Sequence, residues 1–381
     1  MFGIENLPGF LPSLFWGIIT ISFLVFIHEA GHYLAARALG LKVTEFFIGL
    51  PGPNLSFKRG DTTFGITCIP FGGYVRIPAL EGSGPGAELG TMTEEERKEY
   101  EKVPAWRRVV VLLAGIFANL FVAIAILTAL FTHTGIPIDR VVPAEGGPAA
   151  TAGLPDNSRI VAIDGSRVHH FGQLVNIISR HEPGDVIEVT YVSLEGERNS
   201  ITAVLEERPP PEEPAASGAG GDGQQVPTQN QQPAPSAQMG VVLQEITFEQ
   251  AGVFEAFTYS FTYIVLTAEG ISRFFSPSTF QEAIGDATSV VGISVFAAHT
   301  AAAGFVSYAT FIAMISIALG LMNLLPIPPL DGGKIVFEII QKVTGKPVPQ
   351  KLQIGGSLVG VVLLIALMLY VTRQDIFKLL N

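Results

Sequence analysis

Two histidines and a glutamate are spaced for metal chemistry near the end of the first long apolar stretch. The sequence there reads His28-Glu29-Ala30-Gly31-His32. Residues four apart share one face of a helix, so the imidazoles of His28 and His32 can bind one metal ion while Glu29 lies beside it. A zinc ion in such a site activates water, and a neighbouring carboxylate can accept the proton. The pattern predicts a hydrolytic zinc site with Glu29 as the general base.

A catalytic zinc usually takes three protein ligands and leaves one position for water. Asp331 is the strongest candidate for the third ligand, because it follows an uncharged run of 44 residues and should reach the depth of the two histidines. Glu45 stays open as an alternative, although it follows the predicted helix closely. A reading without metal also stays open, with interfacial histidines and a surface aspartate before two glycines. Ionisable groups inside apolar spans are costly and usually functional, which favours the metal site.

The apolar stretches that must position these residues indicate a membrane protein. Of the 381 residues, 48% are hydrophobic and only 15% are charged, against about 25% charged in soluble domains. Each of four uncharged runs exceeds the roughly 18 to 20 residues that cross a bilayer as a helix. The chain is therefore predicted to be a polytopic α-helical membrane protein with four transmembrane helices. These runs are 6–27, 109–138, 287–330 and 352–372.

The charge balance excludes some partners and predicts an orientation. A net charge of -11 repels phosphate, so no nucleic-acid partner is expected, and the single cysteine excludes an intrachain disulfide. The loops at 37–108 and 331–354 hold 14 of the 23 lysines and arginines. Short cytoplasmic loops retain such residues, so these loops and the metal site are predicted toward the cytoplasm. The termini and the central segment are then extracytoplasmic.

The central segment divides by composition. Residues 137–207 alternate short apolar runs with turn signals and predict a small, mostly β domain. Residues 208–238 are rich in Pro, Gln, Gly, Ala and Ser and predict a flexible linker. The apolar stretch Phe254–Phe275 has at most 13 consecutive uncharged residues, so an interfacial amphipathic helix is expected there instead of a fifth crossing.

Several motifs occur together in a characteristic order. His28-Glu29-x-x-His32 is followed much later by Asn323-x-x-Pro326-x-x-Pro329-Leu330-Asp331-Gly332. With these motifs the chain resembles the site-2 protease family, intramembrane zinc metalloproteases of peptidase family M50, and specifically the bacterial RseP-type group. The resemblance extends from about residue 20 to 372, apart from the linker. Supporting matches are Phe71-Gly-Gly-Tyr-Val75, Ala114-Gly-Ile-Phe-Ala-Asn119 and Val291-Gly-Ile293.

The resemblance implies roles for particular residues. Asp331 would be the third ligand of one zinc ion per chain, and Asn323 would hold substrate or a developing oxyanion beside the metal. A helix-capping role for Asn323 is the plain alternative. Gly72 and Gly73 would bind substrate within a membrane-reentrant β hairpin. Asn119 in the second span is placed with the substrate-binding residues and can also make an interhelical hydrogen bond.

The resemblance also implies a function and a location. The expected activity is regulated intramembrane proteolysis of single-span membrane proteins, such as anti-sigma factors or remnant signal peptides, in the bacterial cytoplasmic membrane. The extracytoplasmic β domain resembles a PDZ domain, which would bind peptide or exclude bulky substrates. Two alternatives remain: a catalytically inactive PDZ-bearing membrane adaptor, and a metal transporter.

These inferences divide the chain into segments with separate expected roles. The predicted segments are 1–40, the first transmembrane helix with the histidine pair; 41–104, a cytoplasmic loop with the β hairpin; 105–133, the second transmembrane helix; 134–207, the PDZ-like domain; 208–238, the linker; 239–302, an extracytoplasmic segment with the interfacial helix; 303–334, the third transmembrane helix and the Asp331 motif; 335–354, a cytoplasmic loop; and 355–381, the fourth transmembrane helix and tail.

Overall fold

The chain was analysed as a computed structural model, which describes residues 7–83, 100, 102–168, 171–207, 237–346 and 348–380. It divides into two compact units. The first combines Met1–Phe131 with Gly252–Asn381, and the second is Thr132–Ala251. Residues 208–236 of the predicted linker lie outside the described residues.

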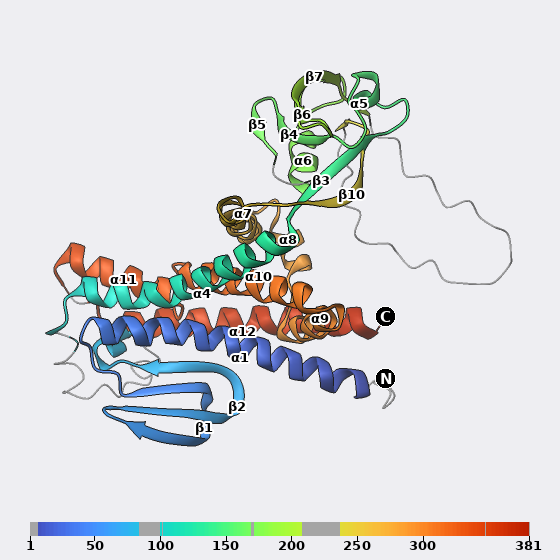
Figure 1. The fold of residues 1–381 in the computed structure, drawn as a ribbon. Helices are drawn as coiled ribbons and strands as arrows, with labels where there is room; N and C mark the ends of the chain where they lie inside the picture. The colour runs from blue at the N-terminus through green and yellow to red at the C-terminus, as the bar shows by residue number, and fades with distance from the viewer. Residues whose placement is uncertain are drawn as a thin grey trace, which may run out of the picture. The chain divides into compact units, whose positions relative to one another are not determined.

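Four helices of the described chain are long and apolar enough to cross a membrane, in agreement with the four predicted apolar stretches. Close packing between them depends on small residues. A Cβ atom at Gly31 would lie 2.5 Å from the carbonyl oxygen of Ala114, and a Cβ atom at Gly320 would lie 3.3 Å from the carbonyl oxygen of Ile116. The helices are α1 (Leu7–Ala38), α4 (Ala105–Thr134), α10 (Phe305–Leu324) and α12 (Gln350–Leu380), and Figure 1 shows them running side by side.

A shorter apolar helix, α9 (Val290–Ala303), packs along α1. Gly17 of α1 has no room for a side chain against Ser294 of α9. The first turn of α9 is held by α12, because the Asp375 carboxylate accepts a hydrogen bond from the Ser289 backbone N–H at 2.7 Å. Gly292 lies against the same carboxylate, which explains the glycine in the Val291-Gly-Ile293 motif. Sequence analysis did not identify this helix.

The other helices of the first unit surround this bundle. Helix α7 (Val253–Ser272) covers most of the stretch for which an interfacial helix is expected, and it packs against α10. Its Tyr259 and Tyr263 both contact the ring of Phe131. The remaining helical segments are η2 (Pro78–Ser83), η3 (Arg273–Phe275), α8 (Phe280–Asp286) and α11 (Asp331–Thr344).

Strands β1 (Glu45–Arg59) and β2 (Thr62–Arg76) form a folded-over sheet beside α1 (Figure 1). Gly60, with a φ of 63°, lies in the turn between them. Both strands double back, so that Phe46 pairs with Phe64 and also with Val75. The end of β2 pairs with the start of β1, and its other edge has no strand partner among the residues that the structure describes; we call it the free edge of β2.

The second unit is a small β domain with two short helices. Strand β3 (Ile136–Pro143) pairs with β10 (Val241–Glu249). Strand β8 (Glu206–Glu207) pairs with β9 (Ala237–Gln238), so the last two residues of the predicted linker 208–238 belong to a strand. A four-stranded sheet has the order β5-β4-β6-β7. Its apolar side chains and those of the two helices form one core. These elements are β4 (Arg159–Ile163), β5 (Ser166–Arg167), β6 (Val186–Val192), β7 (Arg198–Val204), α5 (Pro148–Thr151) and α6 (Phe171–Ile178).

Candidate metal centre

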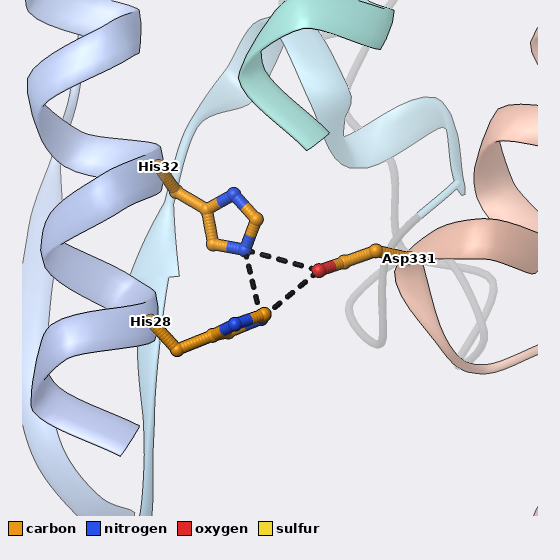
Figure 2. A group of neighbouring side chains, drawn as sticks. All are labelled: His28, His32 and Asp331. Atoms are coloured by element: carbon orange, nitrogen blue, oxygen red, sulfur yellow. Dashed lines mark hydrogen bonds and ion pairs between the residues drawn. The ribbon is translucent and has the colours of Figure 1, made fainter. Parts of the chain in front are cut away.

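Three predicted ligands meet at one buried point. His28 and His32 lie one turn apart on α1, and their Nε2 atoms are 3.2 Å from each other. The Asp331 Oδ2 atom lies 3.0 Å from Nε2 of His28 and 3.1 Å from Nε2 of His32 (Figure 2). All three side chains are buried, at 6 to 7% exposure. The structure therefore brings Asp331 to the depth expected from its place at the end of the third span.

The turn between α10 and α11 sets the position of Asp331. Helix α10 ends at Leu324, and α11 begins with Asp331 itself. The peptide bond between Pro328 and Pro329 in this turn is cis. Gly332 and Gly333 are pressed against the backbone of the turn, with no space for a Cβ atom at either position. Two glycines therefore let the first turn of α11 close tightly behind the carboxylate.

Helix α4 forms the wall behind the two imidazoles. A Cβ atom at Gly115 would lie 2.5 Å from Nε2 of His32 and 3.0 Å from Cε1 of His28. The carbonyl of Val111, one turn earlier, accepts a hydrogen bond from Nδ1 of His32 at 2.8 Å. Gly115 thus makes space for the histidines as well as for helix packing. In the sequence, Gly115 belongs to the Ala114-Gly-Ile-Phe-Ala-Asn119 motif, which did not indicate contact with the histidines.

The donor set fits a zinc ion. Zinc–nitrogen and zinc–oxygen bonds of about 2.0 to 2.1 Å in a tetrahedron place neighbouring ligand atoms roughly 3.3 Å apart, close to the 3.0 to 3.2 Å found here. Nδ1 of His32 donates to the Val111 carbonyl, so that a neutral His32 would present its Nε2 atom to a metal ion. Asn119, beside His28, has a buried Oδ1 atom without a hydrogen-bond partner among the described residues. A ligating His28 needs such an acceptor at its other nitrogen.

The centre opens into a cavity of about 770 Å³. Glu29, Asn323, Gly72 and Gly73 line it together with the three ligands. Asn119 does not line it, because this side chain is fully buried against His28. Glu45 lines the cavity outside the ligand group and faces Arg76, with 3.6 Å between the charged atoms.

The surroundings of the cavity shift the pKa values of two groups that lie outside the spans, Asp331 and Tyr74. Burial alone would raise the pKa of Asp331, but the charge of His32, the hydrogen bonds from both histidines and the Lys334 ammonium hold it well below its usual range. The pKa of Tyr74, which also lines the cavity, is raised by burial and by the Glu45 carboxylate. The centre therefore keeps Asp331 ionised, as a metal ligand must be.

Sequence analysis missed two charged groups on α11. Lys334 lies one turn after Asp331, with its Nζ atom 3.7 Å from Asp331 Oδ1. Glu338, two turns after Asp331, forms a buried ion pair of 2.7 Å with Arg108 at the start of α4. The spacing of three and seven from Asp331 places both on its face of the helix, and this spacing was the only available signal.

Comparisons with known proteins agree with this centre. The family model described as "Peptidase family M50" matches residues 16–367. A protein of Mesorhizobium japonicum named "Putative zinc metalloprotease" is 30% identical, over 97% of this chain and 99% of its own. A protein of the same name from Agrobacterium fabrum is 31% identical, over 96% of this chain and 95% of its own. "Zinc metalloprotease RasP" of Geobacillus kaustophilus is 27% identical, over 97% and 98%. The chain belongs to peptidase family M50 and is a zinc metalloprotease of the site-2 type.

Proposed function

We propose that this protein hydrolyses peptide bonds of single-span membrane proteins inside the bilayer, as an intramembrane zinc endopeptidase. The observation that carries the proposal is a buried group of His28, His32 and Asp331 between helices that are apolar enough to cross a membrane. The open cavity beside this group supports access for a peptide. A hydrolytic site within such helices can meet substrates that themselves span the membrane.

The three ligands and Glu29 have distinct proposed roles. His28, His32 and Asp331 hold the zinc ion, which when bound lowers the pKa of water and polarises the scissile carbonyl. Glu29 follows His28 directly on α1 and lines the cavity, so its carboxylate is placed to accept a proton from water and return it to the leaving amine. Arg76 and Lys334 add positive charge to the wall of the cavity.

Asn323 is proposed to hold the substrate backbone or the developing oxyanion. Its Nδ2 atom donates to the Leu319 carbonyl at 3.0 Å, one turn earlier on α10. This bond fixes the side chain and uses one of the two amide protons, so the other remains for a substrate carbonyl. The position on the cavity wall supports this role over simple capping of α10.

The free edge of β2 is proposed to bind the substrate as an added strand. A transmembrane substrate is helical and must be unwound before its carbonyl reaches a metal, and an edge strand can replace the lost hydrogen bonds. Gly73 lies at this edge, where a Cβ atom would be 3.5 Å from the Glu29 side chain. Gly72 has a φ of 89°, a left-handed conformation that suits glycine. The two glycines therefore let backbone approach the catalytic glutamate.

We also propose an orientation and a setting. The loops rich in Lys and Arg face the cytoplasm, the metal site lies toward the cytoplasmic leaflet, and the β domain is extracytoplasmic and PDZ-like. The setting is a bacterial cytoplasmic membrane. Anti-sigma factors and remnant signal peptides are the proposed substrates.

A cleavage assay tests the activity. Wild type and Glu29→Gln are placed in liposomes with a reporter protein that has a single transmembrane segment. The wild type should cut within the segment, and Glu29→Gln should lose cleavage by about 10² to 10⁴-fold while retaining zinc. Equal cleavage by both would refute the role of Glu29. Zinc uptake into the liposomes without cleavage would favour a transporter, and reporter binding without cleavage would favour an adaptor.

A further inference from the structure

Asn119 has an unusual environment for an asparagine. It lies on α4 within the bundle, and none of its surface is exposed. Its Nδ2 atom is 3.3 Å from Nδ1 of His28, while its Oδ1 atom is buried without a hydrogen-bond partner in the described part of the chain. A buried amide oxygen without a partner costs about 1 to 3 kcal/mol, so its presence requires an explanation.

The tautomer of His28 decides which atom of the Asn119 amide must face its Nδ1 atom. A neutral imidazole has one N–H, and the other nitrogen accepts or ligates. In the arrangement found here, Nε2 of His28 donates to Asp331 at 3.0 Å and Nδ1 accepts from the Asn119 amide. When Nε2 ligates zinc, the proton must be on Nδ1, which then becomes a donor. The neighbouring group must now be an acceptor.

We propose that Asn119 is a positioning residue that reverses its side-chain amide when zinc binds, so that Oδ1 accepts the Nδ1 proton of His28. An amide presents a donor and an acceptor at nearly the same place, so it can satisfy both forms of the imidazole. The main chain at Asn119 does not need to move, because the Ser316 hydroxyl holds its carbonyl at 2.9 Å. This inference rests on the proposed role of His28 as a ligand and differs from the substrate-binding role expected from the sequence.

Two substitutions distinguish acceptance from donation. Asn119→Asp keeps two acceptor oxygens and no donor, whereas Asn119→Leu keeps neither. If the amide oxygen supports the ligating form, Asn119→Asp should bind zinc within about threefold of wild type. Asn119→Leu should bind it about 10 to 100-fold more weakly, the usual effect of losing a hydrogen-bond partner of a metal ligand. Ser316→Ala is the matched control, because it removes a buried hydrogen bond to Asn119 without changing the group that faces His28.

Zinc affinity is measured by competition with a chromogenic chelator, using the full chain in detergent micelles. Circular dichroism at saturating zinc verifies that each variant is folded. If Asn119→Asp lost as much zinc affinity as Asn119→Leu, the proposal would be overturned, because this would mean that donation from the amide is what matters. A zinc affinity of Asn119→Leu within threefold of the wild-type value would also overturn it. If the wild type itself bound no zinc, the metal centre would be refuted along with the role of Asn119.

Discussion

The buried ion pair between Arg108 and Glu338 should stabilise the fold, and the effect of removing one charge should depend strongly on whether the other is present. The Glu338 carboxylate is 1% exposed and receives two hydrogen bonds, from Arg108 at 2.7 Å and from the Tyr100 hydroxyl at 2.8 Å. Arg108 also donates to the backbone carbonyls of Tyr100 and Val103 and lies 3.9 Å from the Tyr100 ring centroid. Removing one charge leaves the other buried and unpaired, which costs about 3 to 5 kcal/mol.

The prediction concerns the single variant Glu338→Leu and the double variant Arg108→Met/Glu338→Leu. The single variant should lose about 3 to 5 kcal/mol of unfolding free energy. The double variant removes both charges. The backbone carbonyls of the half-buried residues Tyr100 and Val103 each lose one hydrogen bond, worth about 0.5 to 1.5 kcal/mol, so the total loss should be about 1 to 3 kcal/mol, and the Tyr100 hydroxyl keeps Gln341 as a partner. The second substitution should therefore restore part of the stability that the first removes.

Unfolding free energies are measured by denaturant titration of the purified protein in detergent micelles. The control is Arg273→Met, which breaks a half-exposed ion pair with Glu282 and should cost under about 1 kcal/mol. A double variant less stable than Glu338→Leu by several kcal/mol would refute the reasoning. A loss below 1 kcal/mol in Glu338→Leu would also refute it, because it would mean that water reaches Arg108.

Three further predictions concern the metal centre and its surroundings. Gly115→Ala should reduce zinc affinity by at least tenfold in chelator competition, because the new methyl group would occupy the space of the imidazoles; unchanged affinity would contradict this packing. Asp331→Ala should lose both bound zinc, measured by elemental analysis, and reporter cleavage; a full equivalent of retained zinc would favour Glu45 as the ligand. Tyr100→Phe should remove part of the alkaline instability. Burial and Glu338 raise the pKa of Tyr100 to about 12, above about 10 in the unfolded chain, so its stabilising contribution is present below pH 10 and decreases between pH 10 and 12. Identical alkaline stability profiles of wild type and Tyr100→Phe would contradict this.

Local patterns predicted the parts of the centre that depend on local structure. The spacing of His28 and His32 needed only a helix, and α1 provides it. The depth of Asp331 followed from the length of the uncharged run before it, which set where the third span ends. Strong helical and apolar signals thus predicted that three candidate ligands far apart in the chain would lie together, as they do.

Contacts between distant segments were not predictable in the same way. Nothing near Arg108 indicates that its partner is Glu338, 230 residues later. Helix α9 was missed because its 14 residues are too short for a span, and its capping carboxylate comes from α12. Such pairs depend on how the helices pack, which single-sequence patterns do not encode.

The separation of the ligands along the chain has a consequence during synthesis. His28 and Asp331 are 303 residues apart, and translation makes the chain from its N-terminus. A ribosome-bound chain that ends before α10 has both histidines and Glu29 but lacks the third ligand. The hydrolytic centre is therefore assembled only after most of the protein has entered the membrane.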